Sequence, residues 1–265
     1  MRPISVVCTV RNEEPNISEL LDSLLLQEGE FEVIVVDAYS DDRTREIVKS
    51  CSKRDTRVRL FLRGGTRGEG RNFGVAQARH SDVAFIDGDN IASPSWLRRL
   101  SGGLETAEVA AGTTVHKGSE KLANLDRVEL YHRGIDVTYP SCNLAYRKEL
   151  FERIGGFDTA FVTAEDIDLN YRAVEAGASL FHVADAVVDH KTRPNFFSFF
   201  KQAFWNGFGR KQLTLKHGGL WKRYKPEQMY RSAGSFWGLA RIGFALLGYI
   251  ACKIYWKPPE AWKKR

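Results

Sequence analysis

The sequence predicts an α/β fold with a mainly parallel sheet, because buried strands alternate with helices through residues 4–90. Apolar runs typical of strands occupy residues 4–10, 31–36, 58–62 and 83–86. Helical spacing and capping residues predict the intervening helices at residues 16–26, 42–52 and 67–78. Crossover connections of this kind bring the carboxyl ends of the strands to one edge of the sheet, where ligands gather.

The pattern is less regular after residue 90, although no repeat or low-complexity linker interrupts it. Helices are predicted at residues 94–105, 148–154 and 165–176, and strands at 108–116, 141–146 and 179–182. A chain of 265 residues is long enough for one large α/β domain with an appendage. We therefore expect one domain over residues 1–192 and a tail over residues 193–265.

The charge of the chain is unevenly distributed. Residues 191–265 contain 16 Lys and Arg but 2 Asp and Glu, whereas residues 1–190 contain 23 Lys and Arg and 31 Asp and Glu. A strongly basic tail on an acidic body indicates an anionic partner, which is either nucleic acid or a negatively charged membrane surface.

The cysteines and the N-terminus bear on the compartment. Cys8, Cys51, Cys142 and Cys252 lack the spacing of a metal site, and they indicate neither a disulfide framework nor a thiol active site. A reducing cytosol is the expected setting. The chain enters a strand-like run almost at once, so no signal peptide is expected.

Asp87-Gly88-Asp89 follows the last of the four strands named above. Alternate side chains of an extended backbone point to the same side, so the two carboxylates can converge on one ion. Mg²⁺ takes one or two protein carboxylates and completes its shell with water and phosphate oxygens, and Mn²⁺ also suits oxygen ligands. The implied ligand is a diphosphate. A plain surface turn is the alternative, because Asp-Gly-Asp-Asn is good turn chemistry.

Six motifs occur in order along residues 4–190. They are Thr-Val-Arg-Asn-Glu at 9–13, the run from Val35 to Thr44, Gly-Arg-Asn-Phe-Gly at 70–74, Asp-Gly-Asp at 87–89, Asn-Leu-Ala-Tyr-Arg at 143–147 with Gly-Gly-Phe-Asp at 155–158, and Glu-Asp-Ile-Asp-Leu at 165–169. Together they resemble the family 2 inverting glycosyltransferases, which have the GT-A fold. The resemblance implies a Rossmann-like, mixed and mainly parallel sheet flanked by helices, and leaves the tail outside the shared pattern.

The resemblance also implies how a nucleotide diphosphate sugar is bound. Asp37 matches the strand-end aspartate that holds the nucleoside, where a carboxylate accepts hydrogen bonds from a ring N–H or ribose hydroxyls. The other expected donor-binding residues are Thr9, Arg11, Glu13, Arg71 and Asp87. Asp87 and Asp89 match the family's D-x-D motif for Mg²⁺ or Mn²⁺, with His190 as a further metal ligand. Ser40 and Asp42 are assigned to helix capping.

On the acceptor side, Glu165-Asp166 matches an acidic pair of the family, and Asp166 is the expected general base. In an inverting transfer this carboxylate takes the proton of the attacking hydroxyl. The competing interpretation is a capping box that starts at Thr163. Asn143 is placed on the acceptor side as well. The donor-binding half then covers residues 1–117 and the acceptor half residues 118–192.

The tail departs from the processive members of the family. Their Gln-x-x-Arg-Trp motif is absent, since Gln202 is not followed by Arg and Trp at that spacing. We therefore expect addition of a single sugar. Residues 196–208 are rich in Phe and Trp, which is most simply packing.

A second feature of the tail is the apolar segment 233–252, which is about long enough to span a bilayer. Arg241 at its middle costs roughly 2.5 to 3.5 kcal/mol on insertion scales. A helical wheel places Gly234, Gly238, Arg241, Ala245, Gly248 and Cys252 on one face, and Phe236, Leu239, Ile242, Leu246, Leu247 and Ile250 on the other. This pattern favours an interfacial helix on an anionic membrane over a true span or a buried or dimer-forming helix. Nucleic acid fits less well, because no known nucleic-acid module is present.

The sequence thus predicts a metal-dependent inverting glycosyltransferase at the cytoplasmic face of the membrane. The expected acceptor is a lipid-linked phosphate or glycan, and a homo-oligomer is compatible with this. Two alternatives stay open. One is a catalytically silent, membrane-bound module that binds nucleotide sugars. The other is a nucleotidyltransferase, which lacks support because no glycine-rich triphosphate loop is evident.

Overall fold

The computed structural model describes residues 1–117, 128–191, 196–220, 224 and 236–263. The chain folds into two compact units. Unit 1 comprises residues 1–116, 139–157 and 172–191, and unit 2 comprises residues 117–138, 158–171 and 192–265. The predicted division into residues 1–192 and 193–265 stays a prediction, since unit 2 also contains residues 117–138 and 158–171. Residues 118 and 193, where the acceptor half and the tail were predicted to begin, lie outside the described residues.

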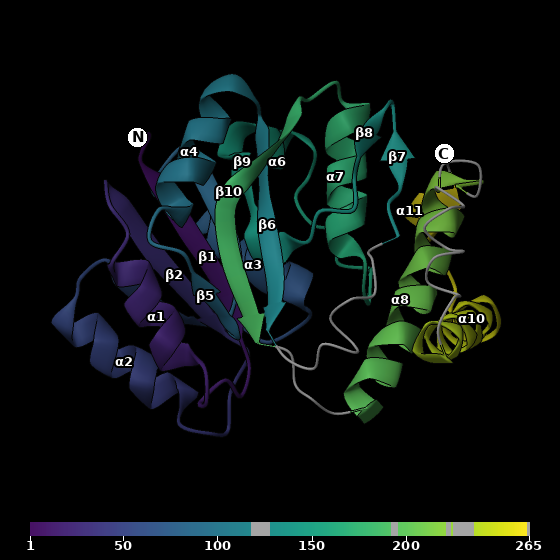
Figure 1. Cartoon of the computed structure of the whole chain (residues 1–265), viewed down its shortest axis with the longest axis horizontal. Helices are drawn as coiled ribbons and strands as arrows, with labels where there is room; N and C mark the ends of the chain where they lie inside the picture. The colour runs from purple at the N-terminus through teal and green to yellow at the C-terminus, as the bar shows by residue number, and fades with distance from the viewer. Residues whose placement is uncertain (118–127, 192–195, 221–223, 225–235, 264–265) are drawn as a thin grey trace. The chain divides into compact units, whose positions relative to one another are not determined.

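Unit 1 is built on one mixed sheet of eight strands (Figure 1). The strands are β1 (Ile4–Val10), β2 (Phe31–Asp37), β3 (Val58–Leu62), β4 (Asp82–Asp87), β5 (Asn90–Ala92), β6 (Val109–Lys117), β9 (Leu144–Arg147) and β10 (Leu180–Lys191). Their order is β3-β2-β1-β4-β9-β6-β10-β5. The strands from β3 to β4 are parallel, whereas β9 is antiparallel to both β4 and β6, and β5 is antiparallel to β10.

Helices cover both faces of this sheet (Figure 1). On one face, α1 (Ile17–Leu25), α2 (Thr44–Arg54) and α4 (Trp96–Thr106) bury apolar side chains in a common core with β1 and β2. On the other face, α3 (Arg67–Ala76) approaches so closely that a Cβ on Gly70 would lie 2.9 Å from Thr9 Cγ2. The short helix α6 (Lys148–Arg153) adds Phe151, whose ring lies 5.6 Å from that of Phe85.

The predicted elements of the first half agree with the structure to within two or three residues at most ends. Two later strands differ from the prediction. Residues 141–143 form a 3-10 turn (η1, Ser141–Asn143) before β9, because Asn143 turns its side chain into the core. The strand expected at residues 179–182 continues as β10 to Lys191, since its far end pairs with β5 at Val188, Asp189 and His190.

Among the residues that the structure describes, a small hairpin and three helices lie wholly within unit 2. The hairpin is formed by β7 (Tyr131–His132) and β8 (Ile135–Asp136), and the helices are α8 (Phe196–His217), α10 (Phe236–Tyr255) and α11 (Glu260–Lys263). Helix α7 (Glu165–Glu175) begins in unit 2 and ends in unit 1.

Helix α10 packs on α8 through small residues. A Cβ on Gly248 would overlap the main chain of Phe204, so these two helices meet where only glycine fits. The opposite face is exposed and carries Leu239, Ile242, Phe244, Leu246, Leu247, Ile250, Ile254 and Tyr255. This division confirms the predicted apolar face for the described side chains, whereas Gly234 and the side chain of Phe236 lie outside them. By length and composition alone, α10 is the one described helix that is able to cross a membrane.

Candidate active site

The carboxyl ends of the parallel strands carry the acidic residues predicted for donor binding. The register of the sheet places Val10 beside Asp37 and Thr9 beside Asp87. These residues therefore end neighbouring strands β2, β1 and β4, as the alternation of strands and helices predicts. The three predicted donor-side residues Thr9, Asp37 and Asp87 thus lie along one edge of the sheet.

Asp37 is fully buried at the end of β2. Its two carboxylate oxygens accept hydrogen bonds from the backbone N–H of Ser40 at 2.8 Å and from the Ser40 hydroxyl at 2.5 Å. A carboxylate has about four acceptor sites, so capacity for a ligand remains. Tyr39, which the sequence did not single out, follows directly with 59% of its surface exposed.

Neither Ser40 nor Asp42 is the N-cap residue of α2, which is Arg43 and has no side-chain cap. Asp42 accepts a hydrogen bond from the N–H of Thr44, the first residue of α2. Ser40 does not cap that helix, because its hydroxyl links Asp37 to the backbone N–H of Asn12. Ser40 therefore braces the loop after β1.

Asp87 is paired with Arg71, the arginine of the glycine-rich helix α3. Arg71 Nη2 donates to Asp87 Oδ1 at 2.8 Å, and its guanidinium lies 5.3 Å from the ring centroid of Phe157. Burial opposes ionisation of Asp87, but the positive charges of Arg71 and Arg67 outweigh it and hold the pKa of that carboxyl below its usual range. The Asp87 carboxyl is thus an anion that is fixed in position.

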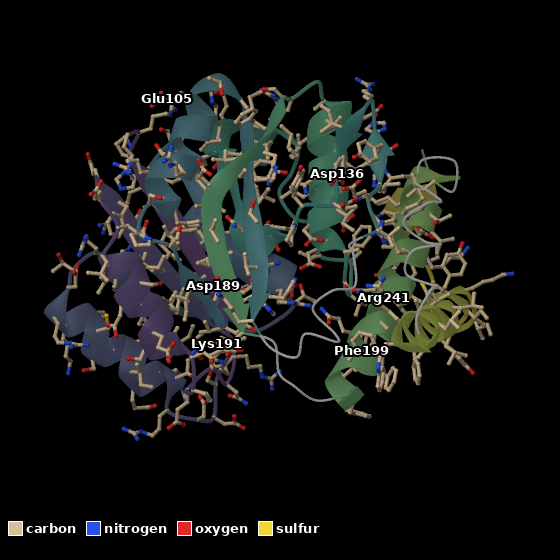
Figure 2. The ribbon with its side chains drawn as sticks, in the orientation of Figure 1. Glu105, Asp136, Asp189, Lys191, Phe199 and Arg241 are labelled. Carbon is tan, nitrogen blue, oxygen red and sulfur yellow. The ribbon has the colours of Figure 1, made fainter. Side chains whose placement is uncertain are left out.

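Asp89 lies at the same edge, beside the end of β10. Its Oδ2 is 3.4 Å from His190 Nε2, and the backbone N–H of Lys191 donates to its carbonyl oxygen. Lys191 and Asp189, labelled in Figure 2, mark this end of β10. The His190 ring contacts the His116 ring at 5.1 Å between centroids, and burial together with the charge of His190 lowers the pKa of His116.

These groups fit a divalent ion that takes few protein ligands. The described residues contain no ready-made cluster of three or more His, Cys, Asp and Glu side chains. They do provide the ionised Asp87, Asp89 and His190, whose Nδ1 is buried without a hydrogen-bond partner. Such a donor set suits Mg²⁺ or Mn²⁺, which complete their shells with water and phosphate oxygens.

The loop after β1 closes over the Asp-Gly-Asp turn. A Cβ on Gly88 would lie 2.8 Å from Glu13 Cγ, so glycine is needed for this approach. Glu13 accepts a hydrogen bond from Asn16, and the neighbouring Arg11 is exposed. The Thr9 hydroxyl is buried and makes no hydrogen bond within the described part of the chain. Thr9 and Glu13 thus belong to the same edge as Asp87.

Asn143 has a structural position instead of the acceptor-side position expected for it. Its side chain is fully buried, accepts from Trp96 Nε1 at 2.8 Å and donates to the carbonyl oxygens of Thr113 and Ala186 at 2.9 Å each. These three bonds connect α4, β6 and β10. Asn143 is therefore omitted from the proposed acceptor site.

The predicted acceptor-side acids lie in unit 2, at the start of α7. Glu165 is buried, and Asp166 is partly exposed with one carboxylate oxygen accepting from the backbone N–H of Ile167 at 2.8 Å. Both acids belong to unit 2, whereas Asp87 and Asp89 belong to unit 1.

Besides Tyr39, two contributors to the site were missed by the sequence analysis. His116 comes from a strand edge that carries no motif, so only the pairing of β6 with its neighbours reveals it. Asn72 follows Arg71 in the glycine-rich motif and binds both backbone groups of Phe157, donating to the carbonyl oxygen and accepting from the N–H at 2.8 Å each. These two hydrogen bonds fix Phe157, whose ring lies against the guanidinium of Arg71.

Comparison with known proteins agrees with this geometry. Residues 5–157 match the model of a family described as Glycosyl transferase family 2. The chain is 29% identical to the glycosyltransferase AglE of Haloferax volcanii, over 80% of this chain and 74% of that protein. It is 28% identical to the uncharacterized glycosyltransferase EpsJ of Bacillus subtilis, over 72% of this chain and 62% of that protein.

Solved structures show the same fold. The mannosyltransferase PcManGT of Pyrobaculum calidifontis, in complex with GDP-Man and Mn²⁺, aligns with a TM-score of 0.65 at 19% identity over 97% of this chain and 77% of that chain. S. aureus TarS in complex with UDP-GlcNAc aligns with a TM-score of 0.63 at 19% identity over 100% and 76%. These likenesses confirm the predicted GT-A fold. The chain spans between about half and three quarters of the length of these and other curated relatives that it matches.

Proposed function

Since the chain belongs to glycosyl transferase family 2, we propose that it transfers one sugar from a nucleotide diphosphate sugar to an acceptor at a membrane, with Mg²⁺ or Mn²⁺. The observation that carries this proposal is the pairing of the buried Arg71 with the ionised Asp87, beside Asp89 and His190. It supports a site for a metal ion and a diphosphate, because fixed carboxylates at strand ends are what such an ion requires.

The donor lies along the carboxyl edge of β1, β2 and β4. Asp37 holds the nucleoside through its remaining acceptor sites, and the exposed ring of Tyr39 is available to stack on the base. Thr9, Arg11 and Glu13 approach from the loop after β1. Asp87, Asp89 and His190 hold the metal ion, which when bound would neutralise the charge that builds up on the departing diphosphate. The UDP, UDP-GlcNAc and GDP-Man complexes of structural neighbours support this class of donor.

Asp166 acts as general base from the acceptor side, with Glu165 beside it. A glycan acceptor attacks the anomeric carbon through a hydroxyl, opposite the leaving diphosphate, and transfers its proton to the Asp166 carboxylate. A phosphate acceptor is already ionised, and Asp166 then only positions it. The sugar configuration is then inverted. Asp166 suits this role because it is an acid at a helix start that is only partly buried.

The acceptor is a lipid-linked phosphate or glycan at the cytoplasmic face of the membrane. The support is the exposed apolar face of α10, bordered by Lys253 and Lys257 in a tail of high positive charge. An amphipathic helix of this kind lies in the headgroup region and is attracted by anionic lipids. Gln202 is exposed on α8 and lacks the Arg-Trp partners of processive enzymes, which supports transfer of a single sugar.

A product assay tests this function. The protein is incubated with a panel of nucleotide sugars, Mg²⁺ or Mn²⁺, and membrane lipids that carry phosphate or glycan acceptors. We expect release of the nucleoside diphosphate, and its abolition by a chelator. Release of pyrophosphate from a nucleoside triphosphate, or binding of donor without any turnover, would contradict the proposal.

A further inference from the structure

The segment that leads to Asp166 is not held by secondary structure of its own. Residues 158–164, the last part of the connection from α6 to α7, form no helix or strand, and Ala164 has a left-handed backbone with φ of 64°. Such a conformation in a residue with a side chain costs free energy and persists only where the surroundings enforce it. The contacts that enforce it come largely from α8, in the C-terminal region.

Gln212 of α8 binds the backbone of this segment at two points. Its side-chain carbonyl accepts from the N–H of Val162 at 3.1 Å, and its amide donates to the carbonyl oxygen of Ala160 at 3.2 Å. The side chain is fully buried, so water does not replace these bonds readily. Gln212 therefore fixes the path of the chain four residues before Asp166.

Lys216, one helical turn further along α8, binds the start of the segment and the first turn of α7, which follows it. Its Nζ lies 2.6 Å from Asp158 Oδ2 and 2.7 Å from Asp168 Oδ1, and its side chain is 4% exposed. Burial opposes ionisation of Asp158, but Lys216 outweighs it and lowers the pKa of that carboxyl. Asp158 begins the segment and Asp168 lies in the first turn of α7, so one ammonium group joins the two sides of Asp166.

Two further contacts complete the arrangement. A Cβ on Gly209 would lie 2.8 Å from Thr163 Cγ2, so α8 touches the segment directly at its closing residues. Trp262 of α11 donates from Nε1 to Asp158 Oδ2 at 2.9 Å, and the ammonium of Lys216 lies 5.3 Å from the centroid of its ring. Positions 209, 212 and 216 follow the spacing of one helix face. The face of α8 that receives α10 is a different one, around Phe204 and Gly207.

We propose that Gln212 and Lys216 are positioning residues: together they form a clamp that holds the segment leading to Asp166, and so holds Asp166 in its reactive position. The C-terminal region then acts in the chemical step as well as in membrane attachment. The inference rests on the proposed role of Asp166 as general base. Loss of the clamp is expected to lower kcat without weakening donor binding, because the donor-binding residues lie in unit 1 and all contacts of the clamp lie within unit 2.

The test compares Gln212→Leu and Lys216→Met with wild type in the full chain. We expect kcat for transfer to fall by about 100-fold, the effect of a misplacement of about 1 Å. The dissociation constant of the nucleoside diphosphate with Mn²⁺ is expected to stay within about 2-fold. Lys216→Arg, which keeps the cation, is expected to restore part of kcat. Gln202→Leu replaces an exposed glutamine of the same helix and is expected to behave as wild type.

The outcomes separate this inference from the function on which it rests. If Asp166→Asn abolishes transfer while Gln212→Leu and Lys216→Met turn over at the wild-type rate, the clamp is wrong and the function stands. If wild type itself transfers no sugar, the proposed function is wrong, and the inference that rests on it is wrong as well. Lys216→Met removes the cation that Asp158 shares with the buried Asp168, so Gln212→Leu, which removes no charge, decides the matter if Lys216→Met does not fold. A Gln212→Leu protein that loses donor affinity in parallel with kcat also overturns the proposal.

Discussion

Arg71 Nη2 donates a 2.8 Å hydrogen bond to Asp87 Oδ1, and only 2% of the Arg71 side chain is exposed. A buried arginine of this kind is paired because an isolated charge is costly inside a protein. The pair connects the glycine-rich helix to the first carboxylate of the Asp-Gly-Asp turn. Arg71 therefore supports the site by fixing Asp87.

The first prediction concerns stability. Arg71→Met leaves Asp87 without its buried partner and is expected to lower the free energy of unfolding by about 3–5 kcal/mol. The double variant Arg71→Met/Asp87→Asn removes the stranded charge and is expected to recover part of that loss. Urea unfolding measures both. Arg99→Met, at an exposed position of α4, serves as control with a change within about 0.5 kcal/mol. Simple addition of the two single-variant losses in the double variant would show that the pair is not coupled.

The second prediction concerns the metal ion. Asp89→Asn keeps the size of the side chain but removes its charge, so Mn²⁺-dependent binding of the nucleoside diphosphate is expected to weaken by more than about 100-fold. Titration calorimetry with and without Mn²⁺ measures this. Asp185→Asn replaces an exposed carboxylate on β10 and is expected to bind as wild type. Metal-dependent binding by Asp89→Asn at wild-type strength would remove Asp89 from the site.

The third prediction concerns pH and Glu32 of β2. Its carboxylate accepts hydrogen bonds from Ser5, Arg59 and the backbone N–H of Arg79. Burial opposes ionisation, but these partners outweigh it and lower the pKa of Glu32. A lowered pKa stabilises the fold above the unfolded value of about 4.3, and this contribution is lost as the pH falls through the folded value.

Urea unfolding at several pH values checks the sign. Glu32→Gln is expected to be less stable than wild type by about 3–5 kcal/mol at pH 7. The difference is expected to shrink as the pH falls below about 4, where wild type loses the same contribution. If the difference in the free energy of unfolding between wild type and Glu32→Gln grew as the pH fell, the pKa of Glu32 would be raised instead of lowered.

The fourth prediction concerns α10. Leu246→Glu and Leu247→Glu place charges on its exposed apolar face, and each is expected to weaken binding to anionic vesicles by at least about 10-fold, because burying one leucine contributes about 1.5–3 kcal/mol. Vesicle cosedimentation measures the change. Leu26→Glu, at a leucine that is 79% exposed in unit 1, is the matched control and is expected to bind as wild type. Equal binding by all three variants would show that α10 does not contact lipid.

Much of the fold followed from periodicity, since β1 to β4 and the helices between them alternate regularly. The position of the donor site was predicted from the residues that end the parallel strands, and Asp37 and Asp87 do lie at the same edge of the sheet. Asn143 was assigned to the acceptor side because a sequence motif identifies a residue but does not show where its side chain points. Only the hydrogen bonds from Trp96 and to Ala186 show that this side chain points into the core. Gln212 and Lys216 carry no motif at all, and their role depends on contacts between segments far apart in the sequence.

The most direct test of the central claim is the turnover of Asp166→Asn. The change preserves shape and removes the proton acceptor, so kcat for sugar transfer to a glycan hydroxyl is expected to fall by about 10²- to 10⁴-fold. The affinity for the nucleotide sugar, whose proposed ligands lie in unit 1, is expected to be unchanged. Transfer by Asp166→Asn at the wild-type kcat would contradict the assignment of the base and, with it, the proposed mechanism.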